Sequence, residues 1–132
     1  MESETMTEIH SAVDIVTARQ RGRALALDLG FSGGEVTLIA AAISEVARNI
    51  VDHAKQGKIV MNRLNGKEPG IQIVATDDGP GITDVAQAMQ YGYSTRKGLG
   101  VGLPGAKWLM DEFDIVSRVG KGTTVTMKKW LR

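Results

Sequence analysis

Residues 32–54, SGGEVTLIAAAISEVARNIVDHA, predict the most regular helix of the chain. Ser32 and Glu35 have the spacing of a capping box, which satisfies backbone N–H groups at a helix start. Apolar residues then recur at helical intervals, at Val36, Ile39, Ala40, Ile43, Val46, Ala47, Ile50 and Val51. Glu45 and Asn49 fall on the face opposite that stripe, with Asp52 and the small Ala41 and Ala42. We therefore expect the second face to pack against or bind something.

Weaker patterns on both sides of this helix predict the remaining elements. Arg19, Arg21 and Arg23 cluster within the first predicted helix, either as a solvated face or as a docking surface for an acidic partner. The polar, glycine-bounded stretch 92–100 is expected to be a mobile lid. The expected elements are a short strand and a helix within 9–29, strands at 58–64 and 71–76, helices at 83–91 and 101–112, and strands at 113–119 and 123–130.

The composition limits what kind of protein this is. The 132 residues are 42% hydrophobic and 23% charged, which predicts one globular domain over residues 1–132. A net charge of +1 and an aromatic content of 5% argue against nucleic-acid binding. The absence of cysteine excludes disulfides and thiolate metal sites, and no apolar run approaches the roughly 20 residues of a membrane span. We expect a soluble, cytoplasmic protein with no membrane partner.

Glu45 and Asn49 form the first candidate for chemistry. Residues at i and i+4 are neighbours on a helix face. An Asn side-chain oxygen is a suitable hard ligand for Mg²⁺, and a Glu beside it can accept a proton from an attacking hydroxyl. Taken alone, the pair is weak evidence, because any exposed helix carries Glu and Asn at such a spacing by chance.

Asp77 is the second candidate because it follows a predicted strand, in the run Asp77-Asp78-Gly79-Pro80-Gly81. Ligands of α/β sheets often bind at such strand ends. The carboxylate could accept a hydrogen bond from the exocyclic amine of adenine, while Gly79 and Gly81 would let the backbone approach the base. The alternative is an ordinary Asp-Gly turn.

Two further glycine-rich segments complete the pattern. Gly98, Gly100 and Gly102 resemble a phosphate loop, in which amides from Leu99 to Leu103, including Val101, would point at phosphates at a helix start. Arg96 and Lys97 could meet the γ-phosphate or form a solvated pair. The run Gly120-Lys121-Gly122-Thr123 could serve only as a hairpin turn, but Thr123 would lie near Asp77 if the two strands that carry them are adjacent.

The order of these motifs, over nearly the whole chain, resembles the GHKL ATPase/kinase superfamily. The resemblance implies an α+β fold, a Bergerat-type two-layer α/β sandwich whose mixed, mostly antiparallel sheet is covered on one face by helices. Within the superfamily, four segments resemble the RsbT-like serine/threonine switch kinases of bacterial stressosomes: residues 14–20, 44–50, 109–113 and 129–132.

Membership would imply a partner-switching kinase that binds ATP and Mg²⁺. It would phosphorylate STAS-domain proteins similar to RsbS and RsbR, and on release would bind a downstream effector such as a PP2C-type phosphatase. Glu45 would be the general base, Asn49 the Mg²⁺ ligand and Asp77 the adenine acceptor. The other nucleotide contacts would be Gly79, Gly81, Gly98, Leu99, Gly100, Val101, Gly102, Leu103 and Thr123. Two alternative hypotheses are an anti-sigma-factor kinase that sequesters a sigma factor, and a non-catalytic, ATP-dependent switch module.

Overall fold

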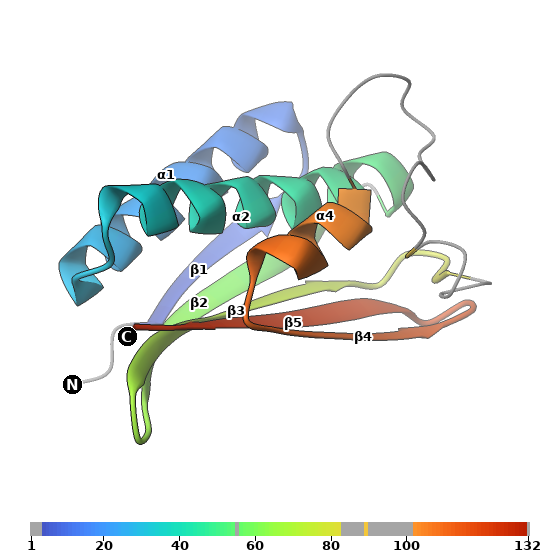
Figure 1. Ribbon diagram of the computed structural model, residues 1–132. Helices are drawn as coiled ribbons and strands as arrows, with labels where there is room; N and C mark the ends of the chain where they lie inside the picture. Colours follow the sequence, from blue (N-terminus) through green and yellow to red (C-terminus); the bar gives the residue numbers. More distant parts are fainter. Residues whose placement is uncertain (1–3, 55, 83–88, 90–101, 132) are drawn as a thin grey trace.

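A five-stranded sheet with helices on one face forms the molecule (Figure 1). The computed structural model describes residues 4–54, 56–82, 89 and 102–131. The strands follow the order β1-β2-β3-β5-β4, and their pairings are antiparallel. In chain order, the elements are β1 (Glu4–Ile9), α1 (Ala12–Leu29), α2 (Gly33–His53), β2 (Gly57–Asn65), β3 (Pro69–Asp77), α4 (Gly102–Leu109), β4 (Glu112–Arg118) and β5 (Gly122–Trp130).

The expected α+β, two-layer architecture is therefore confirmed. The sheet differs from the expectation in one respect, because the pairings among the described strands include no parallel one. Both predicted hairpins are present, as β2–β3 and β4–β5. In the described part of the chain, no helix has the length and apolar character needed to cross a membrane.

The core lies between the sheet and α2, which runs between α1 and α4 in the helical layer (Figure 1). Alternate residues of the strands point toward the helices, as the period of two in a β-strand requires. The largest fully buried side chains come from both layers: Ile39, Ile43 and Ile50 from α2, and Ile9, Ile59, Met61, Ile71, Ile73 and Met127 from the sheet. This packed core fixes the strands, and with them the positions of the polar residues at the strand ends.

The start of α2 has the predicted capping box. The hydroxyl of Ser32 accepts a hydrogen bond from the backbone N–H of Glu35 at 3.2 Å, and the backbone N–H of Ser32 donates to the Glu35 carboxylate. The last helical residue is His53, and the N–H of Ala54 still donates to the carbonyl of Ile50. Local sequence therefore predicted both ends of this helix.

The first strand was placed too late in the sequence. Ile9 is the last residue of β1, paired with Gly57 of β2, and not the first residue of a strand. The chain turns immediately afterwards, because the N–H groups of His10 and Ser11 both donate to the carboxylate of Asp14. That turn starts α1 at Ala12.

The predicted end of the helix at 101–112 was also wrong. The helix α4 ends at Leu109, and the N–H of Asp111 donates to the carbonyl of Lys128 at 3.0 Å. Glu112 therefore belongs to β4, because it pairs with Lys128 of β5. The helical pattern of the sequence gives no sign of this pairing. The expected helix at 83–91, apart from Met89, and the expected lid at 92–100 lie outside the described residues.

Candidate functional site

Glu45 connects two of the predicted motifs directly. Its side chain is only 12% exposed, and Oε1 accepts a hydrogen bond from the backbone N–H of Gly102 at 3.0 Å. Gly102 is the last glycine of the glycine-rich motif and the first residue of α4, with a φ of +69° that favours glycine. The other carboxylate oxygen, Oε2, accepts from Nη1 of Arg48 at 3.1 Å.

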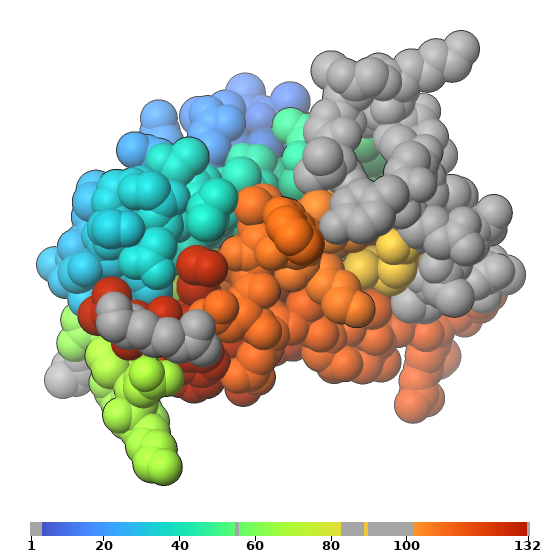
Figure 2. All heavy atoms as spheres, viewed as in Figure 1, coloured from blue at the N-terminus to red at the C-terminus, as the bar shows by residue number. Residues whose placement is uncertain are grey.

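Opposite charges hold the two ends of α4. The carboxylate of Glu45 lies at the N-terminus, and Nζ of Lys129 donates to the carbonyl of Leu109 at the C-terminus at 3.1 Å. Both contacts oppose the partial charges of the helix dipole. In the space-filling view, α4 (orange) packs against α2 (Figure 2). The second face of α2 thus packs against α4, as its small and polar residues suggested.

Asn49, the predicted metal ligand, lies one helical turn after Glu45 and is partly buried. Among the described residues, no group of three or more His, Cys, Asp or Glu side chains could hold a metal ion.

Asp77 ends β3 and shapes the turn that follows. Its Oδ1 accepts a hydrogen bond from the N–H of Gly79 at 2.9 Å, and no described donor contacts Oδ2. A Cβ added at Gly79 would lie 2.6 Å from the Cβ of Ala54, so this turn lies directly against the C-terminal end of α2. Within the described residues, one oxygen of this carboxylate therefore has no hydrogen-bond donor.

Thr123 lies opposite Asp77, because the two residues pair in register between β5 and β3. Its hydroxyl is 2.8 Å from the hydroxyl of Ser117 on β4, and Ser117 also accepts from the N–H of Ile82 at 2.7 Å. Sequence reasoning missed Ser117. The available signal was strand alternation, which places a Ser after Phe113 and Ile115 on the inward face of β4.

Two glycines allow the turn after β3 to meet the β4–β5 turn. Gly81 has a φ of +79°, and a Cβ there would strike the carbonyl of Arg118. Gly122 has a φ of +118°, and a Cβ there would strike the carbonyl of Asp77. These close backbone contacts explain why both turns require glycine. They do not depend on a bound ligand.

The rest of the predicted glycine-rich segment, together with Arg96 and Lys97, is outside the described residues: Gly98, Leu99, Gly100 and Val101. Leu103 is described, and its side chain is buried in the core. Only its backbone is therefore available to a ligand.

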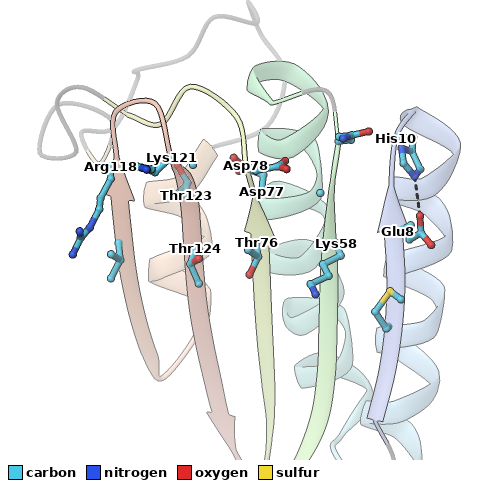
Figure 3. A pocket seen from close by; sticks show the side chains of 15 residues that line it. Glu8, His10, Lys58, Thr76, Asp77, Asp78, Arg118, Lys121, Thr123 and Thr124 are labelled. Atoms are coloured by element: carbon cyan, nitrogen blue, oxygen red, sulfur yellow. Dashed lines mark hydrogen bonds and ion pairs between the residues drawn. The ribbon is translucent and has the colours of Figure 1, made fainter.

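A hollow of about 760 Å³ lies on the other face of the sheet (Figure 3). Thr76, Thr124 and Lys58 line it from neighbouring strands, and the helices lie behind the sheet in this view. At one end the hollow also reaches Asp77 and Thr123, whereas Glu45 belongs to the helical layer and does not line it.

Comparisons with known proteins identify the family of this chain. The family described as "Histidine kinase-like ATPase domain" matches residues 10–129. The chain is 46% identical to the serine/threonine-protein kinase RsbT of Bacillus subtilis, over 100% of both chains. It is 35% identical to the anti-sigma F factor of Caldanaerobacter subterraneus, covering 74% of this chain and 71% of the relative.

Solved structures show the same fold at lower sequence identity. The RsbU and RsbW domains of a Mycobacterium tuberculosis protein give a TM-score of 0.67 at 22% identity, over 100% of this chain and 33% of that one. The mycobacterial sensor histidine kinase MprB gives 0.57 at 12% identity, over 98% and 97%. The full-length match, the ATPase-domain match and the shared fold together establish that this chain belongs to the histidine kinase-like ATPase domain family, among its RsbT-like serine/threonine-protein kinases.

Proposed function

We propose that this kinase transfers the γ-phosphate of ATP to a serine or threonine of a STAS-domain partner, with Glu45 as the general base. The contact between Glu45 and the N–H of Gly102 carries this proposal. It brings a carboxylate, the amide side chain of Asn49 one turn later and the N-terminus of a helix into one neighbourhood. Helix N-termini bind phosphate through free N–H groups and the helix dipole.

The adenine would lie at the other end of this site, against Asp77. Gly79 contacts Ala54, which is nine residues after Glu45, or about 14 Å further along α2 at 1.5 Å per residue. That separation suits an extended nucleotide with its base at one end and its terminal phosphate at the other. The free oxygen of Asp77 would accept from the adenine amine, with Gly79, Gly81 and Thr123 beside it.

The reaction needs little covalent chemistry from the protein. The partner's hydroxyl oxygen forms a bond to the γ-phosphorus, the bond to the β–γ bridging oxygen breaks, and ADP leaves. Glu45 takes the proton of the attacking hydroxyl. Because Glu45 accepts from the Gly102 N–H, the amide of Leu103 would face the phosphates at the start of α4.

Mg²⁺ fits the site through Asn49. The amide oxygen is a neutral, hard ligand, and Mg²⁺ is usually held by one or two protein ligands together with waters and substrate phosphates. When bound, the ion would neutralise charge on the transferred phosphoryl group. Asn49 would hold the ion, and Glu45 would stay free to accept the proton.

The partners are inferred from the relatives. The match to RsbT favours STAS-domain substrates similar to RsbS and RsbR, and a downstream effector such as a PP2C-type phosphatase that binds the released kinase. We place this exchange of partners in the cytoplasm. A second function, sequestration of a sigma factor, is favoured by the anti-sigma F relatives, although these match only 74% of the chain.

The transfer is tested by intact-mass analysis of STAS-domain proteins from the same genome after incubation with the kinase and Mg-ATP. Glu45→Gln is a better variant than Glu45→Ala, because the amide oxygen can still accept from Gly102 while the base is removed. Glu4→Gln, the same change at an exposed position of β1, is the matched control.

The proposal predicts an added phosphate on a partner Ser or Thr with the wild type and Glu4→Gln, and only a small residual transfer with Glu45→Gln. ATP affinity should be similar in all three. Absence of transfer to every STAS candidate, despite ATP binding, would overturn the proposal, and binding of a sigma factor would then support the second function.

A further inference from the structure

We propose that Arg48 is a positioning residue that holds Glu45 in the orientation required of the base. This inference rests on the proposed function of Glu45. Arg48 follows Glu45 by three residues on α2, so their side chains are neighbours on the same helix face. Sequence reasoning singled out Glu45 and Asn49 and passed over the arginine between them.

The contact divides the carboxylate between two donors. Oε1 accepts from the backbone N–H of Gly102 at 3.0 Å, and Oε2 accepts from Nη1 of Arg48 at 3.1 Å. A Glu side chain has three rotatable bonds, and a single contact would leave the carboxylate free to rotate. Two donors on different oxygens fix its plane.

The two contacts still leave the base able to act. An ionised carboxylate offers about four acceptor positions, two on each oxygen. Gly102 and Arg48 occupy one position on each oxygen. A partner hydroxyl can therefore approach Glu45 without displacing either donor.

Burial makes this ion pair more than a surface contact. The side chain of Glu45 is 12% exposed and that of Arg48 is 27% exposed. Exposed ion pairs contribute little because water screens the charges. Here the carboxylate is buried beside the start of α4, so water screens the Glu45–Arg48 pair less than it screens an exposed pair.

A double-mutant cycle separates positioning from a general structural role. In Arg48→Gln, we expect kcat for transfer to a STAS-domain partner to fall about tenfold, with ATP affinity unchanged, because misalignment acts on the reacting geometry. In the Glu45→Gln background, Arg48→Gln should not lower the residual rate further. Arg48→Lys should recover much of the rate, since an ammonium can replace the single Nη1 contact. Arg63→Gln, at an exposed position of β2, is the matched control.

A second readout does not depend on kinase activity. In a ¹⁵N NMR spectrum, the Gly102 amide should move in Arg48→Gln toward its position in Glu45→Gln, and should stay in place in Arg63→Gln. An unmoved Gly102 amide, or an equal loss of rate in both backgrounds, would overturn the positioning role. If the wild type transfers no phosphate while the Gly102 amide moves as expected, the proposed function fails and the structural link between Arg48, Glu45 and Gly102 stands.

Discussion

Glu45 is predicted to stabilise the fold as well as to act in catalysis, and two substitutions separate these roles. Glu45→Ala removes the acceptor of the Gly102 N–H at the start of α4 and the partner of Arg48. Glu45→Gln keeps an acceptor oxygen of the same shape but removes the charge. Both variants should lose phosphoryl transfer, while their stabilities should differ.

The magnitude follows from the two contacts. A hydrogen bond to a charged group contributes about 1.5–3 kcal/mol, whereas a neutral one contributes about 0.5–1.5 kcal/mol. The pair with Arg48 adds at least about 0.3–0.5 kcal/mol, the value for exposed pairs on a helix, because both side chains are largely buried here. We therefore expect Glu45→Ala to lower the free energy of unfolding by about 2–3 kcal/mol and Glu45→Gln by about 1 kcal/mol.

Thermal unfolding followed by circular dichroism measures the difference. For a chain of this length, about 1 kcal/mol corresponds to roughly 3 °C, so Tm should fall by about 8 °C in Glu45→Ala and about 3 °C in Glu45→Gln. Glu4→Ala, at an exposed position of β1, should change stability by less than about 0.5 kcal/mol.

Nucleotide binding gives an independent check on the same reasoning. Because Glu45 holds the start of α4, Glu45→Ala should also weaken ATP binding, and Glu45→Gln should leave it within about threefold of the wild type. Equal Tm values for the Ala and Gln variants would refute the argument, since the bond to Gly102 would then contribute nothing to the fold.

Three further predictions concern the rest of the site. Asp77→Asn should weaken ATP binding at least about tenfold, measured by calorimetric titration, with little loss of stability, because the amide oxygen preserves the turn while the charged acceptor is lost. Lys129→Met should lower the free energy of unfolding by about 1–3 kcal/mol in urea, because it leaves the carbonyl of Leu109 without its charged donor; an unchanged urea midpoint would contradict this. Ser117→Ala should cost about 1–2 kcal/mol by the same assay, because the N–H of Ile82 loses its acceptor; a loss no larger than that of Glu4→Ala would exclude this role.

Local rules explain why α2 was predictable from the sequence. A capping box and a 3.6-residue apolar period act over neighbouring residues, so the helix and the pairing of Glu45 with Asn49 on one face follow from spacing alone. The alternating hairpin strands were predictable for a similar reason, to within a residue or two. The ends of β1 and α4 were not, because pairing with β2 and β5 decides where those elements stop.

The sequence by itself thus determined the helical and strand periods, the glycine turns and the order of the motifs that identify the family. Only the tertiary structure decided which motifs touch. The bond from Glu45 to Gly102 spans 57 residues, and Ser117 became part of the site through contacts with Ile82 and Thr123. The physical reason is range: helix caps and side-chain alternation are set by neighbours in the chain, whereas such contacts exist only after α2, α4 and the sheet have packed together.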